Sequence, residues 1–187
     1  MAEKLTSAKA GESFALESFP TLKPAFRLIT HFNERIQCGD IAAGETLVAV
    51  PLKSGGTVVS VGDYEPKVKF TIHSSTDFFT VDNDKQTGRI DAQAILLDEE
   101  GRAVHFINKG QTELNEETIP HLLGTPGAES SKWGNAIEYI RFRSGHPEYK
   151  MLERRLFVGS QRFIYLDGVH TGIELRMAEV IAGTGAD

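Results

Sequence analysis

The chain has 187 residues, of which 40% are hydrophobic and 25% are charged, and its formal net charge is −6. This length fits one domain, and the hydrophobic share is large enough for a core, which argues against bulk disorder. The negative charge argues against nucleic acid and anionic membrane surfaces as partners, because both would repel the protein.

Cysteine use and the N-terminal residues indicate the compartment. Cys38 is the only cysteine in the sequence, so no internal disulfide can form, which suits a reducing environment. Residues 1–4 are interrupted by charge and do not resemble a secretory signal. No stretch approaches the ~18 consecutive apolar residues that a membrane-spanning helix needs. We therefore expect a cytoplasmic protein.

Residues 1–20 are expected to form a flexible leader, followed by a single domain over residues 21–187 that begins near Pro20 and Pro24. Beyond this point, short segments rich in β-branched and aromatic residues alternate with turn signals. Strands are predicted over residues 26–32, 46–50, 57–61, 68–73, 78–81, 89–96, 103–108, 137–142, 155–158, 162–165 and 173–180.

The spacing of these segments indicates the fold class. Short strands separated by frequent turns are typical of an antiparallel all-β sandwich or barrel. No alternation of strands with helices is present, so a doubly wound α/β fold is disfavoured.

The exception to this pattern is an insertion over residues 111–136. Residues 114–123 are compatible with a short helix that Pro120 interrupts, and residues 124–131 read as a loop. A connection of this length in a compact domain is usually a lid, a binding loop or disorder, and we expect a lid. Trp133 either closes a pocket mouth or anchors the loop to the barrel.

Several motifs follow one another in order from Asp77 onward. The pair Asp77-Phe78 comes first, and Asn108-Lys109-Gly110 follows a later strand. The longest motif covers residues 142–153 and reads Phe-Arg-Ser-Gly-His-Pro-Glu-Tyr-Lys-Met-Leu-Glu, after which Leu156-Phe157-Val158-Gly159 follows. This order resembles a family of bacterial and fungal proteins catalogued as domain of unknown function 3237.

The resemblance extends over roughly residues 21–180, with three departures. Gln93 stands where the family's Asp-x-Arg strand has its Arg, Met151 replaces a Trp, and Glu153 replaces an Asn. The family implies a small, closed, lipocalin-like β-barrel and has no generally agreed activity. Some fungal members are associated with secondary-metabolite pathways, which implies small-molecule chemistry. The departures point to a specialised branch.

The strand that contains Asp91 allows two interpretations. Asp91 and Gln93 share one face, and Ile90, Ala92 and Ala94 share the other. In the simpler interpretation the polar face lies in water. In the second interpretation, Asp91 and Gln93 line the barrel lumen, where a buried carboxylate needs a partner because its desolvation is costly.

Three carboxylates at motif positions, Asp77, Asp91 and Glu153, are the candidate catalytic groups. Carboxyl groups that share a pocket of low dielectric constant develop different pKa values, which provides an acid and a base. The alternatives are that Asp77 caps a turn and that Glu153 is an ordinary exposed charge.

Five further residues are candidates for binding a substrate or stabilising charge. His105 lies on a strand face that could be core or lumen, and Arg141 could supply the cation that Gln93 lacks. The remaining candidates are Gln93, Tyr149 and Trp133.

Cofactor and metal chemistry have little support in the sequence. The six histidines form no HxH or HExxH pair, so we expect no metal site. The sequence contains no nucleophile elbow, no phosphate-binding loop and no dinucleotide-binding fingerprint, so we expect no cofactor.

The leading hypothesis is a cofactor-independent enzyme of the isomerase, cyclase or hydro-lyase type, acting on a small, largely apolar organic molecule. A non-catalytic binding or carrier barrel is the second hypothesis, and a structural module is the third. A homodimer is compatible with all three, because several predicted strands carry apolar residues on both faces.

Overall fold

The computed structural model of the chain describes residues 19–166 and 170–183. Most of the expected leader lies outside these residues. The strands are β1 (Thr21–His31), β2 (Ile36–Asp40), β3 (Thr46–Pro51), β4 (Thr57–Ser60), β5 (Lys69–Val81), β6 (Thr87–Leu97), β7 (Ala103–Glu113), β8 (Ala136–Arg143), β9 (Phe157–Leu166) and β10 (His170–Ile181). The helices are α1 (Ile119–Leu123), the 3-10 turn η1 (Pro147–Tyr149) and α2 (Lys150–Glu153).

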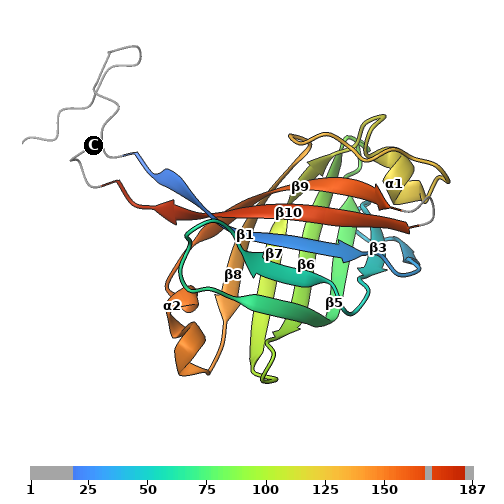
Figure 1. Cartoon of the computed structure of the whole chain (residues 1–187). Helices are drawn as coiled ribbons and strands as arrows, with labels where there is room; N and C mark the ends of the chain where they lie inside the picture. The colour runs from blue at the N-terminus through green and yellow to red at the C-terminus, as the bar shows by residue number, and fades with distance from the viewer. Residues whose placement is uncertain (1–18, 167–169, 184–187) are drawn as a thin grey trace, which may run out of the picture.

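These strands form an antiparallel sheet that closes on itself (Figure 1). The order around the barrel is β5-β4-β1-β10-β9-β8-β7-β6, and pairing between β5 and β6 completes the ring. Strand β5 is long enough to pair with β4 through its first residues and with β3 through its last. The predicted closed barrel is therefore confirmed.

Two pairs of predicted strands are single strands in the structure. Residues 68–73 and 78–81 both overlap β5, and residues 155–158 and 162–165 both overlap β9. Strand β2 was not predicted, because residues 36–40 have no alternating pattern. The expected helix is shorter than predicted, because Pro120 lies in its first turn and Gly124 ends it in a left-handed conformation.

Strand β5 contains a bulge that decides which of its side chains face inward. The register against β6 shifts between Ile72 and Ser74. Before the shift, Phe70 and Ile72 are buried in the main core; after it, Asp77 and Phe79 line the interior. One extra residue in a strand reverses the in–out alternation beyond it, so the bulge turns Asp77 into the barrel.

One end of the barrel is filled with aromatic side chains and is covered by η1 and α2. Phe142 packs edge-to-face against Phe26, Phe106 and Phe157, with ring centroids 5.3–5.4 Å apart. Each such contact contributes about 0.5–1.5 kcal/mol beyond the area that it buries. Leu152 of α2 is completely buried in the same cluster.

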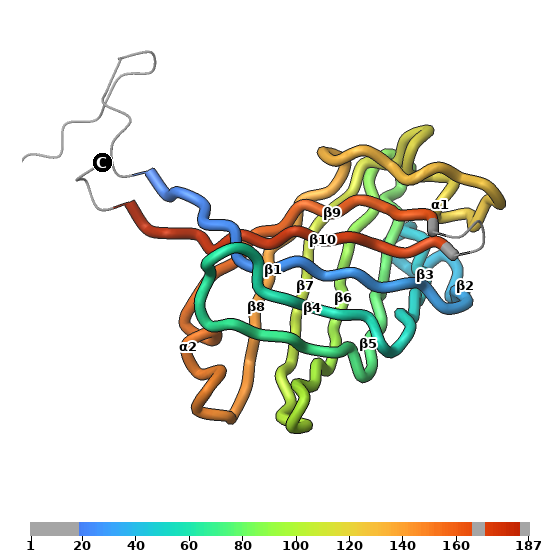
Figure 2. The backbone as a smooth tube through the Cα atoms, in the orientation of Figure 1, coloured from blue at the N-terminus to red at the C-terminus, as the bar shows by residue number. Residues whose placement is uncertain are grey.

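The other end of the barrel lies beneath α1. Strand β8 runs between the two ends, since it follows the α1 segment and leads into η1 and α2 (Figure 2). No helix among residues 19–166 and 170–183 is long and apolar enough to cross a membrane.

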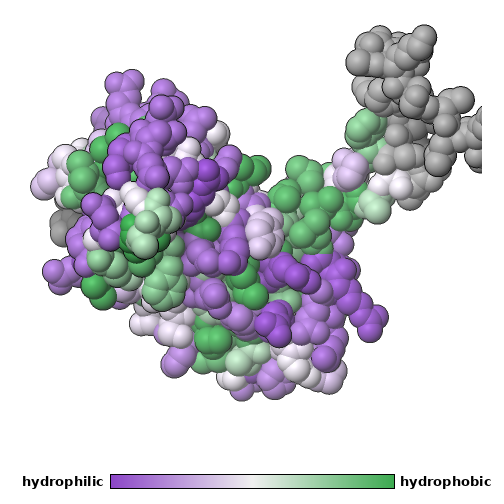
Figure 3. All heavy atoms as spheres, turned by 180° about the vertical axis from the view of Figure 1, so that it is seen from behind, coloured by the Kyte–Doolittle hydropathy of each residue, from purple (hydrophilic) through white to green (hydrophobic). Residues whose placement is uncertain are grey.

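Strands β1 and β10 continue as a two-stranded ribbon past the barrel wall. Thr21 pairs with Ile181 at its tip, and the side chains of Leu22 and Ile181 are exposed. Apolar side chains gather where the ribbon leaves the barrel (Figure 3). The homodimer stays a prediction.

Candidate functional site

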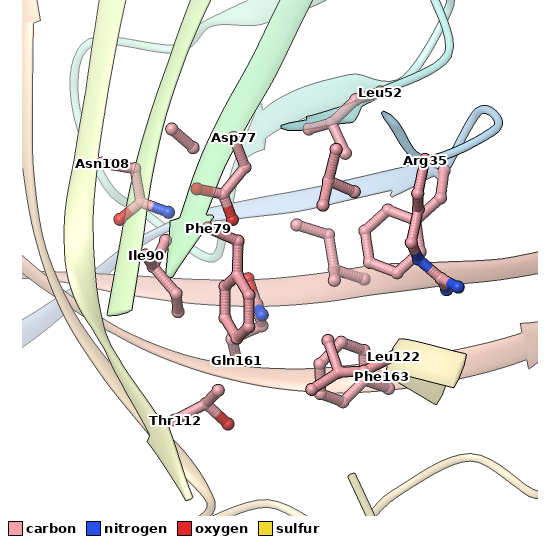
Figure 4. A pocket seen from close by; sticks show the side chains of 14 residues that line it. Arg35, Leu52, Asp77, Phe79, Ile90, Asn108, Thr112, Leu122, Gln161 and Phe163 are labelled. Atoms are coloured by element: carbon pink, nitrogen blue, oxygen red, sulfur yellow. The ribbon is translucent and has the colours of Figure 1, made fainter. Parts of the chain in front are cut away.

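A cavity opens into the barrel at the α1 end (Figure 4). The space between its lining atoms is about 480 Å³ when open solvent at the mouth is included, and about 30 Å³ of it is open to the centres of water-sized spheres. Its wall is mainly apolar, with a few polar groups, as is usual for small-molecule sites. The apolar wall includes Phe32, Val50, Leu52, Phe79, Ile90, Leu122 and Phe163, and the polar residues are Arg35, Asp77, Asn108, Thr112 and Gln161.

Asp77 of β5 places a carboxyl group in this apolar wall. Its Oδ1 accepts a hydrogen bond of 2.8 Å from the backbone N–H of Asp91, and the described residues give it no other hydrogen bond. Burial raises the pKa of Asp77 to about 7; the hydrogen bond opposes this rise, and the negative charge of Asp91 adds to it. Both protonation states of Asp77 are therefore populated near neutral pH.

Glu138 of β8 is a second carboxyl group near this wall. It is 2% exposed, and its Oε2 accepts a 2.7 Å hydrogen bond from Nδ2 of Asn108, which lines the cavity. Burial raises the pKa of Glu138 to about 8; the Asn108 bond opposes this rise, and the charge of Asp77 adds to it. The two carboxyl groups are thus electrostatically coupled.

The Asn108-Lys109-Gly110 motif provides both the partner and the space for Glu138. Gly110 lies opposite Glu138 in the pairing of β7 with β8. A Cβ atom at Gly110 would lie 2.6 Å from Cγ of Glu138 and 2.3 Å from the carbonyl oxygen of Ile137. Only glycine leaves room here, so the motif is explained by the buried carboxyl group beside it.

The cavity mouth is covered by α1 and by Arg35. The Arg35 guanidinium donates a hydrogen bond to the carbonyl oxygen of His121, and desolvation lowers the pKa of Arg35. The His121 ring stacks on Phe163 with centroids 5.1 Å apart. Leu122 extends from α1 into the cavity wall. Helix α1 therefore borders the cavity, and its action as a lid stays a prediction.

Of the three candidate carboxylates, only Asp77 lies in the cavity. Asp91 lies on the outer face of β6, 2.6 Å from Lys109, and its side chain is 41% exposed. The simpler interpretation of this strand therefore applies: Asp91 and Gln93 face outward, while Ile90 and Ala92 face inward. Gln93 contacts His105 at 3.0 Å on this outer face, so neither lines the lumen.

The other predicted residues lie at the α2 end or on the outer wall. Oε1 of Glu153 accepts a hydrogen bond from the backbone N–H of Ser144. The hydroxyl of Tyr149 donates a hydrogen bond of 2.5 Å to the carboxylate of Asp98. Arg141 is exposed on β8. Trp133 packs against two outer arginines, so it acts as an anchor and does not reach the cavity. The expected convergence of Asp77, Asp91 and Glu153 does not occur.

Sequence reasoning missed Glu138 and Gln161, and it quoted Asn108 in a motif without assigning it to the site. Each is a polar residue on the otherwise apolar, inward face of its strand, as Glu138 shows between Ala136 and Ile140. A polar residue that interrupts an apolar face at period two was the available signal.

The family model for DUF3237, described as a protein of unknown function, matches residues 20–180. The chain belongs to this family. Similar solved structures show the same fold. A conserved protein of unknown function from Rhodopseudomonas palustris is 19% identical with a TM-score of 0.66, and the match covers 87% of this chain and 99% of that one.

Two other structural neighbours have more informative descriptions. A β-barrel-like protein from Acinetobacter baumannii is 17% identical with a TM-score of 0.62, over 87% of this chain and 96% of that one. A protein from Penicillium herquei, described as an enzyme, is 15% identical with a TM-score of 0.55, over 89% of this chain and 98% of that one. No curated protein matches the chain significantly.

Proposed function

We propose that this DUF3237 protein is a cofactor-independent enzyme in which Asp77 transfers a proton to or from a small, largely apolar organic molecule. The observation that supports this proposal is a carboxyl group with a pKa of about 7 in a mainly apolar cavity. A general acid–base group works best when its pKa lies near the working pH. Isomerisation, cyclisation and addition or loss of water are the reactions that such a group serves.

Asp77 has the contacts that this role requires. Its Oδ1 is held by the backbone of Asp91, which fixes the orientation of the carboxyl group. The second oxygen is therefore left for a substrate. A positioned general base of this kind contributes about 10²–10⁴-fold to the rate of a reaction.

The remaining polar residues of the cavity bind and orient the substrate. The amides of Asn108 and Gln161 and the hydroxyl of Thr112 provide donors and acceptors in a wall that otherwise contacts hydrocarbon. Arg35 provides a positive charge at the mouth. Because polar groups are few, each one restricts the orientation of a bound molecule strongly.

The biological setting belongs to the same proposal. Some fungal members of the family are associated with secondary-metabolite pathways, which supports a role in such biosynthesis, and the description of the Penicillium herquei neighbour as an enzyme supports catalysis. A cytoplasmic location suits such a role. A carrier barrel without catalysis is the alternative, and the mainly apolar wall agrees with it as well.

Exchange of substrate hydrogens with solvent tests catalysis without knowledge of the reaction. Small apolar carbonyl, enol and alkene compounds are first screened for stabilisation of the protein against heat. Each compound that binds is then incubated with the protein in D₂O and analysed by mass spectrometry. We expect deuterium incorporation or product formation with wild type, and about a 10²-fold or greater loss with Asp77→Asn at retained binding.

Asp91→Asn and Glu153→Gln are the matched controls, because both remove a carboxylate that lies outside the cavity. Both variants should retain deuterium incorporation. Binding by wild type with neither incorporation nor product would support the carrier and overturn the enzyme. Full incorporation by Asp77→Asn would overturn the role of Asp77.

A further inference from the structure

Half-buried arginines in this protein have carboxylate partners, with one exception. Among the described residues, the arginines of this kind are Arg35, Arg102, Arg155 and Arg162. Nitrogen atoms of Arg102, Arg155 and Arg162 lie 2.6–3.2 Å from carboxylate oxygens of this chain. Arg35 forms no ion pair within the described part of the chain, and desolvation alone lowers its pKa. Arg35 is therefore a partly desolvated cation without a counter-ion.

The contacts that Arg35 makes leave its positive charge unbalanced. Its Nη2 donates to the carbonyl oxygen of His121, and its guanidinium carbon lies 5.7 Å from the centroid of the Phe32 ring. A carbonyl oxygen and a ring face carry partial charges only. The Nε atom of Arg35 has no hydrogen-bond partner among the described residues. A guanidinium that gives up hydration without an anion in return is costly, so a negative group beside it would be favourable.

Arg35 and Asp77 are the ionisable side chains among the described residues that line the cavity. They lie on opposite sides of it, and the wall between them is mainly apolar (Figure 4). Arg35 is at the mouth, where it contacts α1, and Asp77 is in the wall that β5 forms. A molecule that spans the cavity therefore meets a cation at one end and the proposed acid–base group at the other.

We infer that the molecule bound in this cavity is an organic acid whose carboxylate is held by Arg35 while its hydrocarbon part extends toward Asp77. This inference rests on the proposed function, because it presents carbon atoms of the same molecule to Asp77. The planar guanidinium matches a carboxylate, which accepts two parallel N–H donors. The net charge of the protein is −6, so an anion requires a local cation to remain bound.

The inference narrows the class of substrate. The reacting carbon lies at the end of the molecule that is remote from the carboxylate, since Asp77 lies across the cavity from Arg35. This separation keeps the negative charge of the ligand away from Asp77, so ionised Asp77 can still accept a proton there. The apolar wall between the two ends suits an aromatic or aliphatic body.

Matched pairs of small ligands test the inference without knowledge of the reaction. Benzoate, phenylacetate and 3-phenylpropionate are compared with their primary amides, which have nearly the same shape and no charge. Dissociation constants for the whole protein are measured by isothermal titration calorimetry at pH 7. We expect at least one carboxylate to bind about 10-fold or more tightly than its amide, because a hydrogen bond to an ionised group is the stronger one.

Substitution of Arg35 assigns this preference to one side chain. Arg35→Gln removes the charge but keeps an N–H donor for the carbonyl oxygen of His121. Its affinity for the carboxylate should fall to that for the amide, while its affinity for the amide stays the same. Arg141→Gln removes the same charge from an exposed position of β8 and should retain the preference. Arg35→Lys keeps the charge and should retain part of it, which decides the matter if Arg35→Gln binds neither ligand.

Nuclear Overhauser effects place the bound ligand. Ring protons of the carboxylate should give signals to the methyl groups of Leu52 and Leu122, which line the cavity. The inference is overturned if no carboxylate binds better than its amide, if the preference survives in Arg35→Gln or is lost in Arg35→Lys, or if a bound carboxylate gives no such signals.

The deuterium assay separates this inference from the proposed function. Exchange that depends on Asp77 but occurs only with uncharged compounds would leave the proposed function standing and overturn the role of Arg35. Carboxylates that bind through Arg35 and never exchange or react would confirm the class of ligand, support a carrier and overturn the enzyme.

Discussion

The two ends of the barrel are built from the same strands and serve different purposes. At the α2 end, inward positions carry rings such as Phe142 and Phe157, which are buried and pack edge-to-face with ring centroids 5.3 Å apart. At the α1 end, the same strands place Asn108, Glu138 and Gln161 at inward positions. Stability is concentrated where packing is complete, and chemistry is possible where polar groups are left partly unsatisfied.

The polar groups at the two ends also differ in how fully they are paired. Asp98 accepts hydrogen bonds from Tyr149 and Arg102 at 2.5 and 2.6 Å, and these bonds hold the pKa of Asp98 below its ordinary value against the effect of desolvation. Asp77 and Glu138 have no cationic partner in the described residues, and burial raises the pKa of each. A fully paired acid secures a structure, whereas Asp77, which lines the cavity without a cationic partner among the described residues, is the acid that the proposed function uses.

The largest expected effect is the loss of stability caused by a Phe→Ala substitution, which should differ between the two ends of the barrel. Phe142→Ala should lower the free energy of unfolding by about 3–5 kcal/mol, because its ring contacts three other rings in the filled core. Phe79→Ala should cost roughly half as much, since the Phe79 ring borders the cavity and loses fewer contacts. Urea denaturation measures both values, and equal losses would contradict the comparison.

The second expected effect concerns pH at the hollow end. The folded pKa of Asp77, about 7, lies above its ordinary value of 3.8, so folding favours the protonated form. Relative to Asp77→Asn, the wild-type protein should lose stability as the pH rises from about 4 to about 7, and little beyond that. The total difference should reach about 2–4 kcal/mol.

Unfolding curves of both proteins at pH 4, 6 and 8 measure this difference. The Asn side chain retains an oxygen for the Asp91 N–H, so the comparison isolates the charge. A difference that does not depend on pH would show that Asp77 is ionised in the fold without penalty.

The third expected effect tests the paired acid at the filled end. Tyr149→Phe removes the hydroxyl that donates to Asp98 and should lower the free energy of unfolding by about 1–2 kcal/mol. Tyr139→Phe, at an exposed position of β8, is the matched control and should be nearly neutral. Deuterium incorporation should be the same in both variants, and a specific loss in Tyr149→Phe would place Tyr149 in the site.

The smallest expected effect concerns the outer wall. Asp91→Asn breaks an ion pair with Lys109 in which both side chains are about 40% exposed. Such pairs contribute about 0–1 kcal/mol to the free energy of unfolding. High salt should remove most of the difference in stability between wild type and Asp91→Asn. Thermal unfolding at low and high salt measures it, and a loss of several kcal/mol would show that the carboxylate is more than a surface partner.

Segments rich in β-branched and aromatic residues, separated by turns, were sufficient to predict most strands and an all-β sandwich or barrel, and the resemblance to the family supplied the closed barrel. Alternation placed Asp91 and Gln93 on one face of their strand but did not decide which face points inward, and the choice of Asp91 as a catalytic group in the lumen was wrong. Asp77 was found through a motif. Its inward direction depends on the bulge between Ile72 and Ser74, which no pattern of residues in the sequence predicts. Glu138 was overlooked because a charged residue in a strand is ordinarily assigned to solvent.

The bulge in β5 has a consequence for how such a site is gained or lost. Deletion of one residue between Ile72 and Ser74 would restore regular pleating and exchange the directions of Asp77 and Phe78. The interior would then receive an aromatic ring in place of an acid, while the strand count and closure stayed the same. A single codon therefore decides whether an acid or an aromatic ring faces the cavity, while the scaffold is left unchanged.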